Sequence, residues 1–194
     1  MLDKVCCIID VDGFSVRIPS ESGDCYRNQF LVRELGYVRV DPVYTYLPRS
    51  YLFDLSQSYD FSRIPDAEAK TLRYQSRIIT GLSLLPGPTE SDCLDIRTLP
   101  DVLLKIYDRC RTVDADLVAY KGGCRESDLL KELAIPALDL QRFGCPAFKE
   151  LMAKRNYKDC GHHKEVERDG AVHCSMAEVE AYRDWFMLNV RRYR

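Results

Sequence analysis

The sequence lacks several features that would assign the protein to a broad class at once. It has no excess of positive charge, because 28 Lys and Arg residues face 30 Asp and Glu residues and the net charge is −2. A generally basic nucleic-acid-binding surface is therefore excluded, and any contact with nucleic acid must come from a local patch. The sequence also has no apolar stretch of the length that spans a bilayer, so we expect no membrane contact.

Signals for secretion are scarce as well. The apolar run near the N-terminus is too short for a signal peptide, and Asp10 and Asp12 interrupt it. The nine cysteines are odd in number and scattered along the chain, which argues against a disulfide framework. These observations predict an intracellular protein in a reducing compartment, either cytoplasmic or nuclear.

The composition is that of a soluble globular protein, with 46% apolar and 30% charged residues. A chain of 194 residues is long enough to bury a core and lies within the usual range for one domain. We find no repeat, no low-complexity tract and no linker. The sequence therefore predicts a single domain over residues 1–194.

The order of apolar patterns predicts an α/β fold. Three strands come first, and helices and strands then alternate to a final helix. The expected strands are 4–17, 30–41, 43–55, 114–123 and 135–143. The expected helices are 66–81, 98–111, 125–134, 145–155 and 175–194. Such an order is typical of a mixed sheet, with an antiparallel N-terminal part and parallel later strands, flanked by helices.

Two acidic residues end the apolar run of the first expected strand, in the stretch "IIDVDGF". Asp10 and Asp12 are two positions apart, so both side chains point to the same face of the strand. Two carboxylates at a buried strand end repel each other unless a cation lies between them. Oxygen ligands of this kind suit Mg²⁺ or Mn²⁺. The alternative is a solvated strand end in which Asp12 and Gly13 form a turn.

Two further carboxylates lie in the first turns of expected helices. Glu126 follows a strand and a glycine turn, where the helix dipole alone would favour an acid, as it would Asp128. Glu178 follows Ser175 by three residues, a spacing that also suits a helix-capping box. A capping box would explain Ser175 and Glu178 without a function, but it leaves His173 unexplained.

All three histidines of the chain lie close together, in "CGHHKEVERDGAVHC". The fifteen residues contain Cys160, His162, His163, His173 and Cys174. Cys160 and His163 have the C-x-x-H spacing that lets two ligands bind one tetrahedral ion, and Cys174 could complete the site from the helix start. Sulfur and nitrogen ligands together favour zinc. The alternative is a chance cluster in a polar loop.

Taken in order, these motifs resemble the DEDDh branch of the RNase H-like 3′–5′ exonuclease superfamily. The matching stretches are "IIDVDGF", "RELGYV", "LVAYKGGCRESDLL", "IPALDL" and "HCSMAE". The resemblance implies an RNase H-like fold and hydrolysis of phosphodiester bonds in single-stranded RNA or DNA. It implies Mg²⁺ or Mn²⁺ as catalytic cofactor. The implied cation ligands are Asp10, Asp12, Glu126 and Glu178, and the implied general base is His173.

Three positions depart from the exonuclease pattern. Asp12 stands where the family usually has Glu, and Glu178 stands where it has Asp. The third acid normally lies five residues after a strand-end His. Here Tyr120 takes the place of that His, Arg125 falls at the spacing of the acid, and Glu126 follows one position later. The displaced third acid favours the alternative that the protein is not catalytic.

The chain also resembles the Maelstrom domain, which is RNase H-like and carries a Glu-Cys-His-Cys zinc signature. Glu34, Cys160, His163 and Cys174 match that signature in order, and "LDLQRFGCP" is similar to the stretch before its zinc loop. This likeness implies a structural Zn²⁺. It also implies an alternative function, a catalytically inactive module that binds RNA or a protein partner.

Overall fold

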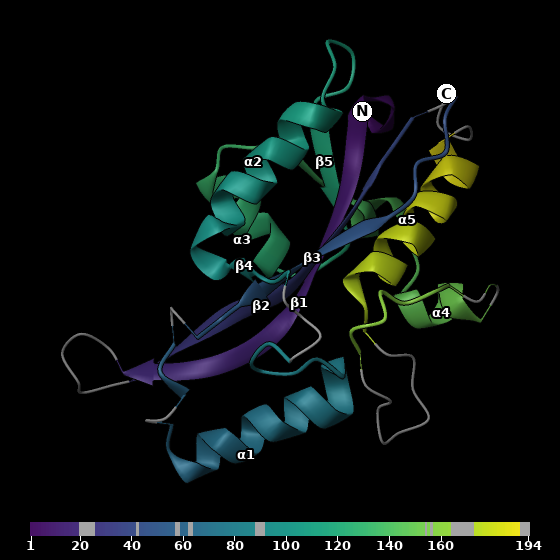
Figure 1. Ribbon diagram of the computed structural model, residues 1–194. Coiled ribbons are helices and arrows are strands. Elements are labelled where there is room, and N and C mark those ends of the chain that lie inside the picture. The colour runs from purple at the N-terminus through teal and green to yellow at the C-terminus, as the bar shows by residue number, and fades with distance from the viewer. Residues whose placement is uncertain are drawn as a thin grey trace.

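The computed structural model describes residues 1–19, 26–41, 43–56, 59–61, 64–87, 92–153, 155, 157–163 and 173–190. It is an α/β structure built on a mixed sheet of six strands (Figure 1). The strands are β1 (Val5–Pro19), β2 (Tyr26–Arg39), β3 (Arg49–Asp54), β4 (Leu94–Asp95), β5 (Leu117–Tyr120) and β6 (Ala137–Asp139). Their order across the sheet is β4-β3-β2-β1-β5-β6.

In the described part of the chain, five α-helices and several short helical turns join the strands. The α-helices are α1 (Asp66–Tyr74), α2 (Leu99–Cys110), α3 (Arg125–Glu132), α4 (Phe148–Met152) and α5 (Ser175–Val190). The turns are η1 (Leu2–Lys4), the π-helical η3 (Gln75–Thr80), η4 (Ile96–Thr98) and η5 (Leu140–Phe143). None of the helices in the described ranges combines the length and the apolar character needed to cross a membrane.

The mixed sheet is confirmed. β1 pairs with β2, and β2 with β3, in antiparallel fashion, whereas β5 and β6 continue the sheet from β1 as parallel strands. The differences from the expected elements concern length. The third strand begins at Arg49, the last strand stops at Asp139 and continues as η5, and α4 is confined to Phe148–Met152. The two-residue strand β4 was not predicted, because so short a segment carries no periodicity.

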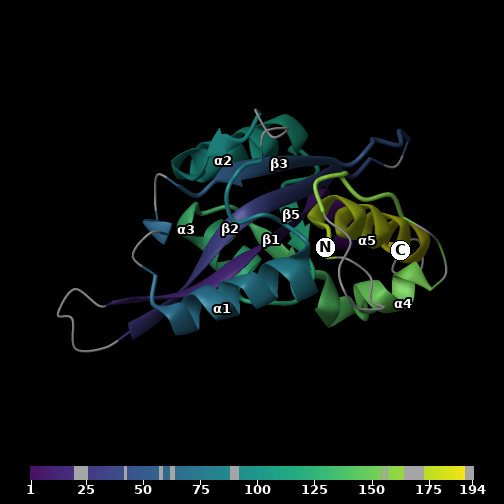
Figure 2. The same ribbon diagram turned by 60° about the horizontal axis from the view of Figure 1, so that its bottom comes forward.

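The two faces of the sheet bury different layers. Cys7 and Ile9 of β1 pack with residues of α2 and α3, whereas Ile8 packs with residues of α4 and α5. Figure 1 shows α5 and α2 on opposite sides of the sheet. In Figure 2, α4 and α5 lie together at one end of the sheet, and the β1–β2 hairpin extends away at the other. Asp10 and Asp12 continue the row of Ile8, so their side chains start from the face that α5 covers.

β1 runs well past the end of β5, with which its last paired residue is Ile8. Beyond that point, successive outward N–H groups of β1 donate to side-chain oxygens instead of to a strand. These hydrogen bonds join Val11 N to Glu126 (3.3 Å), Gly13 N to Asp12 (2.7 Å), Ser15 N to Gln75 (2.8 Å) and Arg17 N to Glu68 (2.9 Å). Side chains from α3, η3 and α1 therefore cover an edge that would otherwise expose backbone donors.

The N-terminus of α5 rests directly on β2. A Cβ atom built on Gly36 would lie 2.2 Å from the carbonyl oxygen and 2.3 Å from the carbonyl carbon of Ser175. Since these neighbours are backbone atoms, no rotamer change can make room. Gly36 is the partner of Asp10 across the β1–β2 ladder, so this close approach sets how near α5 comes to the acidic residues of β1.

We predict that Gly36→Ala destabilises the protein by about 1–3 kcal/mol, because the added methyl group pushes α5 off the sheet. The matched control is Gly87→Ala, where a Cβ atom would have no neighbour within 4 Å and the change should stay within about 0.5 kcal/mol. Urea denaturation of both variants measures the difference. Equal stability of the two variants would contradict the close packing at Gly36.

Candidate functional site

Four carboxylates from three elements gather beside the end of β5, and we call them the acidic cluster: Asp10, Asp12, Glu126 and Glu178. Asp10, Glu126 and Glu178 are all buried, each exposing 8% or less of its surface. Burial, and then the charges of Glu178, Glu126 and Asp12, raise the pKa of Asp10 well above its usual range. The four carboxylates are thus near enough for their charges to act on Asp10, and their predicted catalytic and cation-binding roles stay predictions.

Glu126 enters the cluster from the first turn of α3. Gly122 and Gly123 both have positive φ angles, which only glycine adopts readily, and they turn the chain between β5 and α3. Glu126 Oε1 then accepts the hydrogen bond of Val11 N at 3.3 Å. Burial, with the Glu178 charge adding to it, raises the pKa of Glu126. Asp128, which shares the same helix start, is exposed and lies outside the cluster.

Glu178 is held from two sides at the start of α5. Its Oε1 pairs with His173 Nδ1 at 2.8 Å, and its Oε2 accepts the hydrogen bond of Tyr182 Oη at 2.5 Å. The hydrogen bond that His173 donates to Glu178 raises the pKa of His173. The expected capping box is wrong, because the Glu178 carboxylate turns to His173 and Tyr182 instead of to the helix terminus. Tyr182 was missed, although four residues after Glu178 it must share its helix face.

Asp12 has one oxygen satisfied and one that is not. Its Oδ1 accepts Gly13 N at 2.7 Å, at a β-bulge that shifts the register between Asp12 and Gly13. Its Oδ2 is buried and has no hydrogen-bond partner among the described groups. Burial raises the pKa of Asp12 to about 7. A buried acceptor without a donor is costly, and a bound cation would satisfy it.

A second set of side chains lies next to the acidic cluster, and we call it the metal group: Glu34, Cys160, His163 and Cys174. The four potential ligand atoms all lie within 4.8 Å of one another. His163 Nε2 is 3.1 Å from Glu34 Oε2, and Cys174 Sγ is 3.9 Å from Glu34 Oε1. A carboxylate, an imidazole and two thiols are ligands that zinc accepts, so this group could bind a metal ion such as zinc.

The surroundings of the metal group lower the pKa values of two of its members, Cys174 and Glu34. The Cys160 hydrogen bond, helped by His163, lowers the pKa of the Cys174 thiol to about 6. Burial opposes ionisation of Glu34, but the hydrogen bond and charge of His163 outweigh it and lower the pKa of Glu34. A thiolate and a carboxylate are the forms that coordinate a cation.

The orientation of His163 is fixed by the backbone. The carbonyl oxygen of Thr80 lies 2.5 Å from His163 Nδ1. A carbonyl only accepts hydrogen bonds, so Nδ1 carries the hydrogen and Nε2 is the atom that faces Glu34 and the thiols. Thr80 was not predicted, because a backbone acceptor has no signature in the sequence. His162 lies outside the metal group and lines a separate pocket with Cys93 and Tyr51.

The acidic cluster and the metal group share their supports. Asp12 and Glu34 are direct partners across the β1–β2 ladder. Glu34 Oε2 also accepts Ser175 N at 3.0 Å, which ties the first residue of α5 to β2. His173, which bonds Glu178 of the acidic cluster, and Cys174 of the metal group are neighbours in sequence. The metal group and the acidic cluster are therefore both joined to the N-terminus of α5.

The two sets differ in how tightly they are gathered. Within the described ranges, the metal group is the one set of three or more such side chains that is close enough to hold a metal ion. The four carboxylates of the acidic cluster stay farther apart. Comparison with known proteins adds no further assignment: no protein-family model matches the sequence, and no match is found among curated proteins.

We predict that Tyr182→Phe destabilises the protein by about 1–3 kcal/mol, because a buried carboxylate oxygen loses its donor. Tyr44→Phe, which removes a hydroxyl from a side chain that is 66% exposed, serves as the control and should be close to neutral. Urea denaturation compares the two. A neutral Tyr182→Phe would show that its hydroxyl does not support Glu178.

Proposed function

We propose that the protein is a metal-dependent, 3′–5′ exonuclease-like enzyme that hydrolyses phosphodiester bonds of single-stranded RNA or DNA, with a structural zinc in the metal group. The observation that carries the proposal is the gathering of Asp10, Asp12, Glu126 and Glu178 beside the end of β5, with His173 hydrogen-bonded to Glu178. The mixed sheet with antiparallel first strands agrees with the RNase H-like resemblance.

The chemistry of the donors fits divalent cations. Repulsion among the four carboxylates, and the unpartnered oxygen of Asp12, would both be relieved by Mg²⁺ or Mn²⁺. Such ions would neutralise charge on the phosphate and on the leaving oxygen. The imidazole of His173 is 58% exposed and is oriented through Nδ1 by Glu178, so Nε2 can take a proton from an attacking water.

The zinc proposal rests on the compactness of the metal group. Glu34 and His163 side chains are almost fully buried, at 0% and 1% exposure. A buried carboxylate and a thiolate together carry two negative charges, of which His163 can balance at most one, and a bound Zn²⁺ would balance both. Because Glu34 also accepts Ser175 N, the ion would brace the start of α5 against β2.

A specific observation favours a second candidate. The acidic residues are too far apart to form a metal group, whereas the zinc ligands are close together. This combination would suit a catalytically inactive, Maelstrom-like module that binds RNA or a protein partner. The two candidates differ in one property, hydrolysis.

The nuclease proposal predicts that Asp10→Asn lowers the rate of oligonucleotide hydrolysis by about 100-fold or more, because a cation ligand is lost. Stability should be unchanged or increased, since the substitution removes a carboxylate that is unfavourably buried. The assay uses an end-labelled single-stranded oligonucleotide with Mg²⁺ or Mn²⁺. The control is Asp101→Asn on the exposed side of α2, which should keep full activity.

If the wild-type protein leaves the oligonucleotide intact under all these conditions, the inactive module is the correct assignment. If the wild type and Asp10→Asn yield the same products at the same rate, a contaminating nuclease is responsible.

The zinc proposal predicts about one equivalent of zinc per chain by elemental analysis. Cys160→Ser should lose most of this zinc and melt at a lower temperature, because metal binding contributes to folding stability. Cys124→Ser is the matched control, since Cys124 is exposed and lies outside the metal group, and it should retain the zinc. Zinc-free wild-type protein whose melting temperature is unaffected by added zinc would rule the proposal out.

A further inference from the structure

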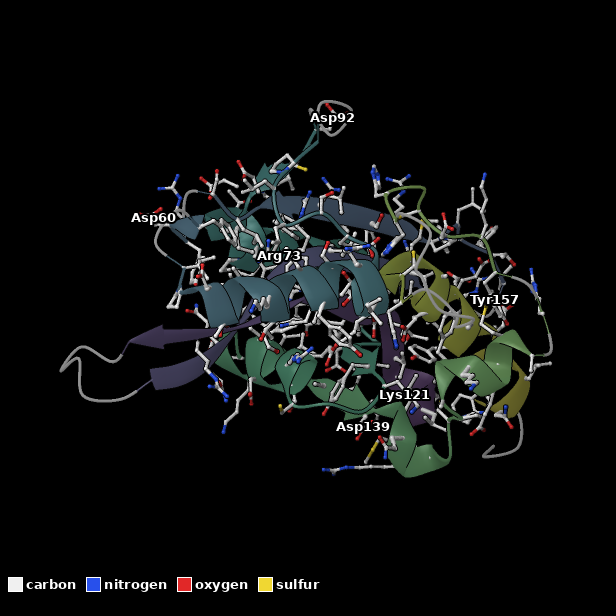
Figure 3. All side chains as sticks on the ribbon, turned by 90° about the horizontal axis from the view of Figure 1, so that it is seen from below. Asp60, Arg73, Asp92, Lys121, Asp139 and Tyr157 are labelled. Atoms are coloured by element: carbon white, nitrogen blue, oxygen red, sulfur yellow. The ribbon has the colours of Figure 1, made fainter. Side chains whose placement is uncertain are left out.

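The outward face of α1 and η3 carries a row of basic residues around a tyrosine. Lys70, Arg73, Tyr74 and Arg77 follow the i, i+3, i+4, i+7 spacing of one helix face, and we call this row the α1 stripe. All four side chains are exposed, and Tyr74 exposes 50% of its surface. Together with Ile78 they line an open depression of about 470 Å³. Figure 3, seen from below, looks onto α1 and labels Arg73 on it.

The charge of the α1 stripe is of one sign. No acidic residue occurs between Ala69 and Thr80, and Glu68, which precedes this segment, accepts a hydrogen bond from Arg17 N. In a chain with a net charge of −2, this face is a local positive patch.

An exposed helix needs no function to carry charge, and α2 provides the internal comparison. Its exposed face mixes both signs, with Asp101 and Asp108 beside Lys105 and Arg109. Mixed charges are typical of a face that only meets solvent. The α1 stripe has neither the alternation of sign nor the purely polar character of such a face, because an aromatic ring is exposed among its cations.

The helix that carries the stripe is fixed to the functional site at two points. The side-chain amide of Gln75, next to Tyr74, bonds both the N–H and the carbonyl of Ser15, at 2.8 and 2.9 Å. Ser15 lies three residues after Asp12 on β1. At the other end of η3, the Thr80 carbonyl bonds His163 of the metal group. The helix that carries the stripe is thereby joined to the strand that bears Asp10 and Asp12 and to the metal group.

The side chains of the α1 stripe indicate which kind of ligand it would bind. The acidic cluster repels phosphates, so a substrate strand needs cations outside the cluster to hold its backbone. Lysine and arginine bind phosphate without regard to sequence, and an exposed tyrosine offers a surface on which an unpaired base can stack. Lys70 and Arg77 are about 10 Å apart along the helix, a span that covers more than one phosphate.

We propose that the α1 stripe binds the backbone and one base of a single-stranded nucleic acid beside the acidic cluster. The inference rests on the proposed nuclease function in one respect, that the bound strand is the substrate. It concerns binding, which can be measured separately from hydrolysis.

The test compares two double variants with the same loss of charge. Lys70→Ala/Arg73→Ala removes two cations of the stripe, and Lys105→Ala/Arg109→Ala removes two exposed cations of α2. Fluorescence anisotropy measures binding of a labelled single-stranded 12-mer, as RNA and as DNA. The buffer contains no added Mg²⁺ or Mn²⁺ and no chelator, so that hydrolysis is prevented and the metal group is left undisturbed.

The stripe variant should bind about tenfold more weakly than wild type, and the slope of log affinity against log salt should fall by about 1.4. Tyr74→Ala should weaken binding by about tenfold with an unchanged salt slope, and Tyr74→Trp should restore it. The α2 variant should bind like wild type.

Three results would overturn the inference: no binding by the wild-type protein, equal losses in the two double variants, or equally effective competition by poly-glutamate. The last result would show that the stripe takes acidic polypeptides. Loss of binding in the stripe variant, combined with a wild type that never hydrolyses the strand, would sustain the inference and refute the nuclease proposal. If the wild type hydrolyses the strand and the stripe variant binds it as tightly as the wild type, the nuclease proposal is sustained and the inference is refuted.

Discussion

The carboxylate of Glu34 is the interaction on which the rest of the site depends. It is fully buried between β2 and the start of α5, where it accepts the backbone N–H of Ser175 and contacts His163. Removing a carboxylate from water is costly, and only several charged or strongly polar partners can offset the cost. Each of these partners comes from a different part of the chain, so satisfying one buried charge brings β2, α5 and the segment around His163 together.

The same carboxylate links two sites with different requirements. The metal group is compact, and its four potential ligand atoms lie within 4.8 Å of one another. The acidic cluster is less compact, and its carboxylates have separate hydrogen-bond partners, such as Val11 N for Glu126 and Tyr182 for Glu178. A rigid structural site next to a looser one would keep the backbone fixed while the carboxylates adjust to incoming cations.

Much of this arrangement follows from local patterns. The two-residue period of a strand places Asp10 and Asp12 on one face, and the glycine turn with positive φ angles explains why Glu126 begins a helix at the end of β5. The C-x-x-H spacing identifies Cys160 and His163. The mixed sheet is confirmed, whereas the catalytic roles, the RNase H-like assignment and the single domain remain predictions.

Other contacts could not have been predicted from the sequence. The Thr80 carbonyl orients His163 across 83 positions, and no residue type encodes a backbone acceptor. The capping-box alternative fails because the Glu178 carboxylate bonds His173 and the buried Tyr182, and this tertiary arrangement leaves it no bond to the helix terminus.

The covered edge of β1 has a consequence for assembly. A second polypeptide could lengthen the sheet along this edge only by detaching Glu126, Gln75 and Glu68 from the backbone that they bond. Glu126 belongs to the acidic cluster, and Gln75 joins η3 to β1. Strand exchange or fibril-like stacking at this edge would therefore dismantle the site, and an intact site keeps the longest strand of the protein closed to such association.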